Sequence, residues 1–96
     1  MHAVTRIYSG KGANELIDVL AKHTKEIETL IRGVKGFVSY SLVRTADGGF
    51  TVSVYQDKAG TDESIVIARE WIKKNASSTG TPAPKITEGS VILQLK

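Results

Sequence analysis

The chain of 96 residues has the length of one domain, and 41% hydrophobic with 24% charged residues is the composition of a folded globular protein. Its net charge is +3 with the two signs interspersed, which argues against a nucleic-acid partner. The lack of cysteine excludes disulfides and a thiol nucleophile. Neither a signal-peptide pattern nor an apolar run of about 18 residues is found, so we expect a cytoplasmic protein without a membrane partner.

The first half of the chain predicts a strand and then a long helix. Residues 3–8 are rich in β-branched and aromatic side chains, which is typical of a strand. Residues 13–32 carry aliphatic side chains at spacings of three, four and seven, which is the pattern of an amphipathic helix. Gly33 follows this segment and is a natural residue for a left-handed helix end.

A hairpin follows the first helix. Residues 37–44 and 50–56 are both predicted strands, because each is rich in Val, Tyr, Phe, Ser or Thr. Ala46–Gly49 between them contains Asp-Gly, a strong turn signal. The two strands are therefore expected to pair antiparallel.

The last third predicts a helix, a loop and a strand. The second helix opens near Thr61–Ser64, where Thr61 or Asp62 would cap it, and ends near Asn75. Residues 77–84 contain two prolines and are expected to form a loop. Residues 90–95 are mostly apolar and are predicted to form the final strand.

The order strand, helix, strand, strand, helix, strand is the ferredoxin-like α+β plan, a single domain over residues 1–96 with both helices on one face of a four-stranded antiparallel sheet. In the third strand we expect Phe50, Val52 and Val54 to face the helices, with the alternate residues of 51–55 on the open face. Two strands carry apolar side chains on both faces. We therefore expect a homodimer in which two sheets enclose a cavity, and the alternative is a bare sheet face on a monomer.

The chain resembles the dimeric α+β barrel superfamily, most closely the antibiotic-biosynthesis-monooxygenase-like domains. The residues that carry the resemblance are Gly33–Phe37 leading to Tyr40, Val54–Asp57 at the hairpin end, and Ala68–Trp71 in the second helix. The resemblance implies oxidation of a small aromatic or quinol-type substrate without a metal or other cofactor; some members degrade haem. The chain departs from the family pattern in two respects. The first strand has Arg6 and Tyr8 where family members often have an Asn, and the only internal His is His23, on the first helix.

Six residues are candidates for the site. The predicted catalytic residues are His23, whose reference pKa suits a general base, and Tyr55. A structural role is the alternative for each of them. The predicted substrate-binding residues are Arg6, Tyr8, Tyr40 and Trp71.

Each binding candidate also has a structural alternative. Arg6 could bind an anion or form a salt bridge at an edge or interface. Trp71 could stack on an aromatic ligand or simply belong to the core, and the tyrosines could bind a ligand oxygen or pack in the sheet. No spacing of His, Asp and Glu predicts a metal site. The sequence thus leaves two hypotheses: a cofactor-independent monooxygenase, or a non-catalytic small-molecule-binding or assembly protein on the same scaffold.

Overall fold

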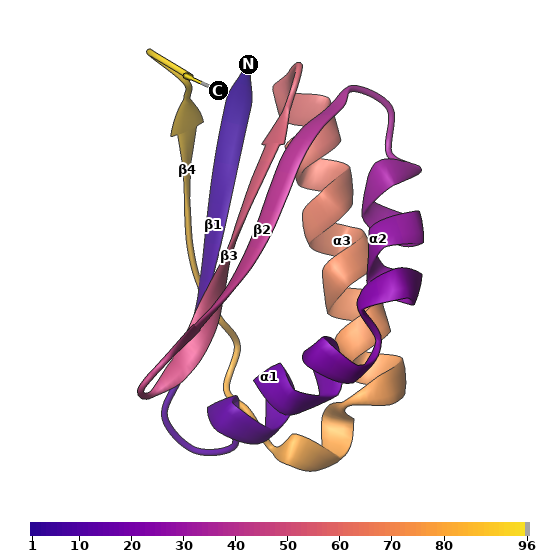
Figure 1. The fold of residues 1–96 in the computed structure, drawn as a ribbon, viewed down its shortest axis with the longest axis vertical. Coiled ribbons are helices and arrows are strands. Elements are labelled where there is room, and N and C mark those ends of the chain that lie inside the picture. Colours follow the sequence, from indigo (N-terminus) through magenta and orange to yellow (C-terminus); the bar gives the residue numbers. More distant parts are fainter. Residues whose placement is uncertain (96) are drawn as a thin grey trace.

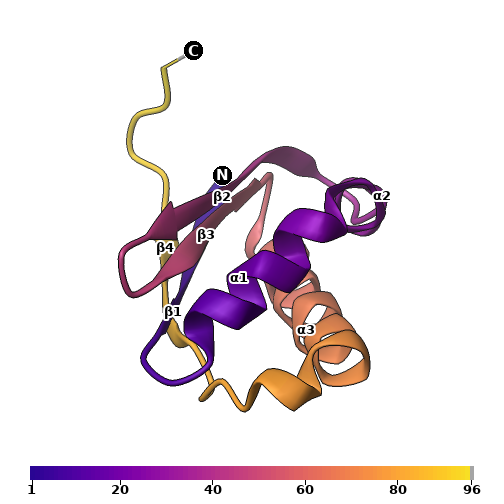
Figure 2. The same cartoon turned by 60° about the horizontal axis from the view of Figure 1, so that its bottom comes forward.

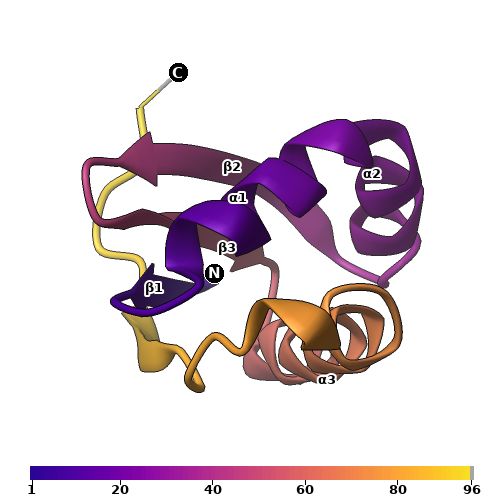
Figure 3. The same cartoon turned by 90° about the horizontal axis from the view of Figure 1, so that it is seen from below.

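The computed structural model describes residues 1–95, which form a four-stranded antiparallel sheet covered on one face by three helices (Figure 1). This confirms the predicted ferredoxin-like class. Seen from below, all three helices lie on the same side of the sheet (Figure 3). The elements are β1 (His2–Ser9), α1 (Ala13–Lys22), α2 (Thr24–Arg32), β2 (Phe37–Thr45), β3 (Gly48–Tyr55), α3 (Lys58–Asn75), a short 3₁₀ helix (Ser77–Thr79) and β4 (Lys85–Ser90).

The strand order is β2-β3-β1-β4, so β1 lies in the middle of the sheet and pairs with both β3 and β4. Arg6 of β1 is aligned with Thr51 of β3, and Thr51 is aligned in turn with Leu42 of β2. Aligned residues share a face, because side chains alternate along each strand. This register therefore decides which side chains meet beneath the helices.

The predicted single helix over residues 13–32 is divided at His23. The backbone N–H of His23 donates to the carbonyl of Leu20, three residues back, and the ring Nδ1 lies 2.8 Å from the carbonyl oxygen of Val19. The side chain thus takes the carbonyl that a continuing helix would use. The break changes the direction of the chain, so that α1 crosses the sheet while α2 runs beside α3 (Figures 1 and 3).

The expected orientation of β3 was wrong. Thr51, Ser53 and Tyr55 face the helices and are fully or almost fully buried, so Phe50, Val52 and Val54 lie on the other face, where Val54 is also buried. The physical reason for this orientation is the ring of Tyr55. The ring of Tyr55 fills the space next to Gly60 of α3, where an added Cβ would lie 2.8 Å from the Tyr55 Cβ, and its hydroxyl reaches an α2 carbonyl.

Two further corrections concern the ends of elements. Gly33 has a right-handed conformation with φ −70°, and Gly36 is the nearby glycine with positive φ. The helix α3 begins at Lys58, earlier than predicted. Its cap is Asp57, whose carboxylate accepts from the Gly60 N–H at 3.1 Å, and not Thr61 or Asp62.

The final strand covers residues 85–90 and not 90–95. Its side chains are all exposed and mostly polar, so no apolar pattern marks it in the sequence. β1 begins at His2, which pairs with Ser90, so later residues have no strand residue to pair with. Residues 91–95 extend beyond the sheet (Figure 2) and leave three aliphatic side chains exposed: Ile92, Leu93 and Leu95.

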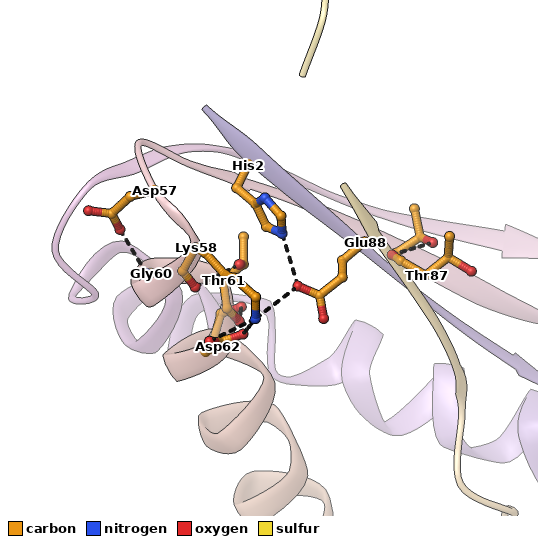
Figure 4. A network of polar contacts seen from close by, with 10 residues as sticks. His2, Asp57, Lys58, Gly60, Thr61, Asp62, Thr87 and Glu88 are labelled. Atoms are coloured by element: carbon orange, nitrogen blue, oxygen red, sulfur yellow. Dashed lines mark hydrogen bonds and ion pairs between the residues drawn. The ribbon is translucent and has the colours of Figure 1, made fainter. Parts of the chain in front are cut away.

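A polar network fastens the start of α3 to the sheet (Figure 4). Glu88 of β4 accepts from the His2 ring at 2.9 Å and lies 3.5 Å from the Lys58 ammonium, which also contacts Asp62 at 2.9 Å. The hydrogen bond with His2 lowers the pKa of Glu88. Within residues 1–95, no helix is long and apolar enough to cross a membrane.

Candidate functional site

The space between the sheet and the helices holds a small inner cavity of about 30 Å³. Strand residues form its floor, and apolar side chains of all three helices form its roof. The strand residues are Arg6, Tyr8, Tyr40 and Thr51. The helix residues are Leu20, Ile27, Leu30, Ile31, Ile67, Ala68, Trp71 and Ile72.

Four predicted binding residues, Arg6, Tyr8, Tyr40 and Trp71, line this cavity. The location differs from the expected one. The predicted cavity lay between the sheets of two subunits, whereas this cavity lies within one chain, under its own helices. The reason is the strand register described above, which turns Thr51 and its aligned neighbour Arg6 toward the helices.

Arg6 is the charged group of the cavity. The residue is 3% exposed, and its Nε donates to the Thr51 hydroxyl at 3.1 Å. Among residues 1–95, no carboxylate forms an ion pair with its guanidinium, so the predicted alternative of a salt bridge is not found there. Burying a charge is costly unless an opposite charge or several hydrogen bonds compensate it.

Tyr8 and Tyr40 place their phenol rings beside Arg6 in the same lining. Burial raises the pKa of each phenol above its ordinary value, and the positive charge of Arg6 opposes this rise. Both phenols are therefore protonated at neutral pH. Each can donate a hydrogen bond to a ligand oxygen and accept another.

Trp71 closes the cavity on the α3 side and is 7% exposed. Its indole Nε1 is buried and has no hydrogen-bond partner among residues 1–95. A buried indole N–H usually has an acceptor. The indole N–H is therefore a buried donor without an acceptor among the described residues, on a residue that lines the cavity.

The two predicted catalytic residues lie outside the cavity lining. His23 is exposed, and its ring meets the ring of Trp71 edge-on with 5.4 Å between centroids. A carbonyl can only accept, so the Nδ1 near Val19 carries hydrogen and Nε2 is the acceptor of the neutral ring. The Tyr55 hydroxyl donates to the carbonyl of Ile31 at 2.9 Å. The catalytic roles of both residues remain predictions.

Two larger cavities adjoin the inner one. The α3 cavity, of about 290 Å³, lies between α3 and residues 81–86 and shares Arg6, Tyr8 and Ile72 with the inner cavity. The α2 cavity, also about 290 Å³, lies between α2 and β2 and shares Tyr40 with it, together with two α2 residues. The inner cavity therefore has lining residues in common with a larger space on each side.

Sequence reasoning missed several polar residues of these cavities, among them Thr51, Arg69 and Lys73. Thr51 accepts a hydrogen bond from Arg6, which lies 45 residues away in the sequence. This contact could be predicted only from the register between β1 and β3. Arg69 and Lys73 line the α3 cavity, and their spacing of four residues places them on one helix face. Their neighbours in the sequence are also charged, so no local signal separates them from an ordinary solvated surface.

No protein-family model matches the sequence, and no curated protein matches it. Solved structures do match. A protein of Deinococcus radiodurans described as an antibiotic biosynthesis monooxygenase has a TM-score of 0.67 at 14% identity, covering 100% of this chain and 97% of that one. SnoaB, a cofactor-independent oxygenase from Streptomyces nogalater, has a TM-score of 0.62 at 15% identity, covering 98% and 94%.

A third similar structure is the haem degrader MhuD from Mycobacterium tuberculosis, which was solved with two haems in its active site. Its TM-score is 0.65 at 16% identity, and the match covers 99% of this chain and 98% of that one. The chain thus has the fold of the antibiotic biosynthesis monooxygenase-like proteins. At these identities the likeness establishes the fold, while the chemistry has to be argued from the cavity residues.

Proposed function

We propose that this protein is a cofactor-independent oxygenase that acts on a small aromatic or quinol-type substrate bound beneath its helices. The observation that carries the proposal is the buried guanidinium of Arg6, which has no carboxylate partner among residues 1–95 and belongs to a largely apolar cavity. A phenolate or enolate would supply the missing negative charge. SnoaB, which has the same fold, is a cofactor-independent oxygenase.

The cavity volumes indicate where the ligand would lie. An apolar cavity of about 150 Å³ can hold a benzene molecule, so the inner cavity of about 30 Å³ is too small for a ring and the α3 cavity of about 290 Å³ is large enough. We therefore place the aromatic ring in the α3 cavity, with its ionised oxygen toward Arg6 and Tyr8, which belong to both. The inner cavity, bounded by Tyr40 and Trp71, is left for dioxygen.

The proposed reaction balances without a protein redox group. A quinol and dioxygen give a hydroxyquinone and one water, in which the substrate supplies four electrons: C₆H₆O₂ + O₂ → C₆H₄O₃ + H₂O. Ionisation of the quinol raises its electron-donating power, and Arg6 favours the anion by charge. The linings of both cavities are largely apolar, which would limit side reactions of the bound anion.

Oxygen uptake tests this function. Purified protein with a panel of hydroxylated naphthalenes and quinols should consume one dioxygen per substrate and form hydroxyquinone, which is followed by absorbance and mass spectrometry. Arg6→Met should lower the rate at least about 100-fold, because a charge that stabilises a developing anion in a dry site is worth about 3 kcal/mol. Lys74→Gln, which lies outside the cavity linings, is the matched loss of one positive charge and should keep the full rate.

The alternative function is ligand binding without turnover. Saturable binding that depends on Arg6, with no oxygen uptake for any member of the panel, would favour this alternative. A panel that neither binds nor reacts would contradict both.

The same assay addresses the predicted catalytic residues. If His23 is a base that contacts the substrate, His23→Ala should abolish oxygen uptake. Tyr55→Phe should abolish the rate if its hydroxyl acts on the substrate. Unchanged rates would assign both residues to support of the fold, through the contact of His23 with Trp71 and of Tyr55 with Ile31.

We also propose that two copies associate through their open sheet faces. That face carries Ile7, which is 42% exposed, and the partly exposed side chains of Phe50 and Val52, with Val43 aligned next to Phe50. Residues 91–95 leave the sheet edge with three exposed aliphatic side chains (Figure 2). Apolar surface of this extent is rarely left in water. The solution mass decides the question, since a dimer would have twice the 10.4 kDa of the chain.

A further inference from the structure

We infer that the substrate carries a carboxylate in addition to its ionisable hydroxyl, and that Arg69 and Lys73 bind this carboxylate at the mouth of the α3 cavity. The inference rests on the proposed binding of an aromatic anion in that cavity. It deepens the proposal by naming the substrate class: a hydroxylated aromatic carboxylate, with its hydroxyl inside and its carboxylate at the opening.

The two cations occupy the exposed end of the cavity. Arg69 and Lys73 are four residues apart in α3, so their side chains are neighbours on one helix face, and both are exposed. Across from them, Pro82 and Pro84 belong to the same lining, and proline fixes the backbone of that segment. The opening therefore has two positive charges on the α3 side and, on the other side, a segment whose backbone is restricted by two prolines.

The charges of this opening are not neutralised by the chain itself. No Asp or Glu belongs to the lining of the α3 cavity, and among residues 1–95 neither Arg69 nor Lys73 forms an ion pair. Like charges four residues apart on a helix repel each other. With Arg6 at the inner end, the cavity carries three positive charges and an otherwise apolar or neutral wall.

The α2 cavity provides a comparison within the same molecule. It has a similar volume, but its cation Arg32 is paired with Glu28 at 2.8 Å and lies over the ring of Phe37. A ligand with two negative charges would gain nothing comparable there. The distribution of charge therefore favours the α3 side as the entrance and binding place for a dianionic ligand.

The inference is tested by calorimetric titration with three naphthalenes of similar shape: 2-naphthol, 6-hydroxy-2-naphthoate and 6-hydroxynaphthalene-2-sulfonate. The naphthoate places its hydroxyl and its carboxylate at opposite ends of the ring system. We expect it to bind about tenfold more tightly than 2-naphthol at low salt, about threefold for each of the two exposed charge contacts. The difference should shrink at 0.3 M salt because the mouth is open to solvent.

Variants locate the effect. Arg69→Gln and Lys73→Gln should each reduce the preference for naphthoate over naphthol about threefold. Lys74→Gln is the matched control, because Lys74 is the adjacent lysine of the same helix and lies outside the cavity linings. It should keep the full preference.

Each failure has a separate meaning. Equal binding of naphthol and naphthoate, or equal losses in Lys73→Gln and Lys74→Gln, would overturn the assignment of the mouth while the aromatic site stands. A clear preference for the sulfonate over the naphthoate would overturn the carboxylate as the anion. If no compound binds in a manner that depends on Arg6, the proposed function itself fails.

Discussion

Replacing Arg6 should make the protein more stable while removing its ligand binding. The guanidinium is buried with 3% exposure, and among residues 1–95 it has no carboxylate partner. Desolvating an ion costs several kcal/mol even after relaxation. Against this stands the hydrogen bond from Nε to the Thr51 hydroxyl at 3.1 Å, worth about 1.5–3 kcal/mol for a charged donor.

The double variant Arg6→Met/Thr51→Val removes both partners and keeps the buried volume approximately constant. We expect it to be about 1–3 kcal/mol more stable than the parent, because two polar groups leave the interior together. For a domain of this size, that corresponds to a rise in Tm of about 5–15 °C. Arg6→Met alone should raise the free energy of unfolding by less, because the buried Thr51 hydroxyl then has no hydrogen-bond donor.

Urea titrations at pH 7 followed by tryptophan fluorescence measure this directly, because Trp71 is the single tryptophan and lines the same cavity as Arg6. Arg44→Met is the control: Arg44 is an exposed arginine paired with Asp18, and its loss should cost at most about 1 kcal/mol. A double variant that is more than about 1 kcal/mol less stable than the parent would refute the reasoning. Arg6 would then be a structural residue and not a charge kept for a ligand.

Three further predictions concern the fold and its assembly. Burial raises the pKa of Tyr55 from 10.0 to about 12, so the folded state retains the phenol proton and stability should fall as the pH rises from 10 to 12. In urea titrations, Tyr55→Phe should lower the free energy of unfolding by about 1 kcal/mol at pH 8, and the two proteins should be equally stable by about pH 11. A difference that stays constant with pH would contradict the raised pKa of Tyr55. Asp57→Ala should cost about 1 kcal/mol through loss of the cap and Asp62→Ala at most half of that, and the reverse order would restore the cap predicted from the sequence. Val52→Lys should convert a 21 kDa species to one of about 10 kDa by light scattering, and a parent that is already monomeric would contradict pairing through the open face.

The sequence alone determined the order of elements and therefore the fold class. The signals for these elements are local: the Asp-Gly turn, the apolar periodicity of residues 13–32 and the β-branched runs. Such signals can be recognised without knowing which residues are in contact in the fold. Their limits were also local. His23 divides the first helix because its ring competes with the backbone for the carbonyl of Val19. The pattern of apolar residues did not predict β4, because an exposed edge strand has no apolar pattern.

Only the tertiary structure decided which face of the sheet meets the helices, and with it the place of the candidate site. A strand pattern predicts that alternate residues share a face but not which face is covered, since Phe50 and Val52 are as apolar as any core residue. The register of β1 with β3 and the fit of the Tyr55 ring against Gly60 made that choice. It brought Arg6, Tyr8, Tyr40 and Trp71 around one cavity, and it left apolar side chains on the open sheet face, through which we propose that two copies associate.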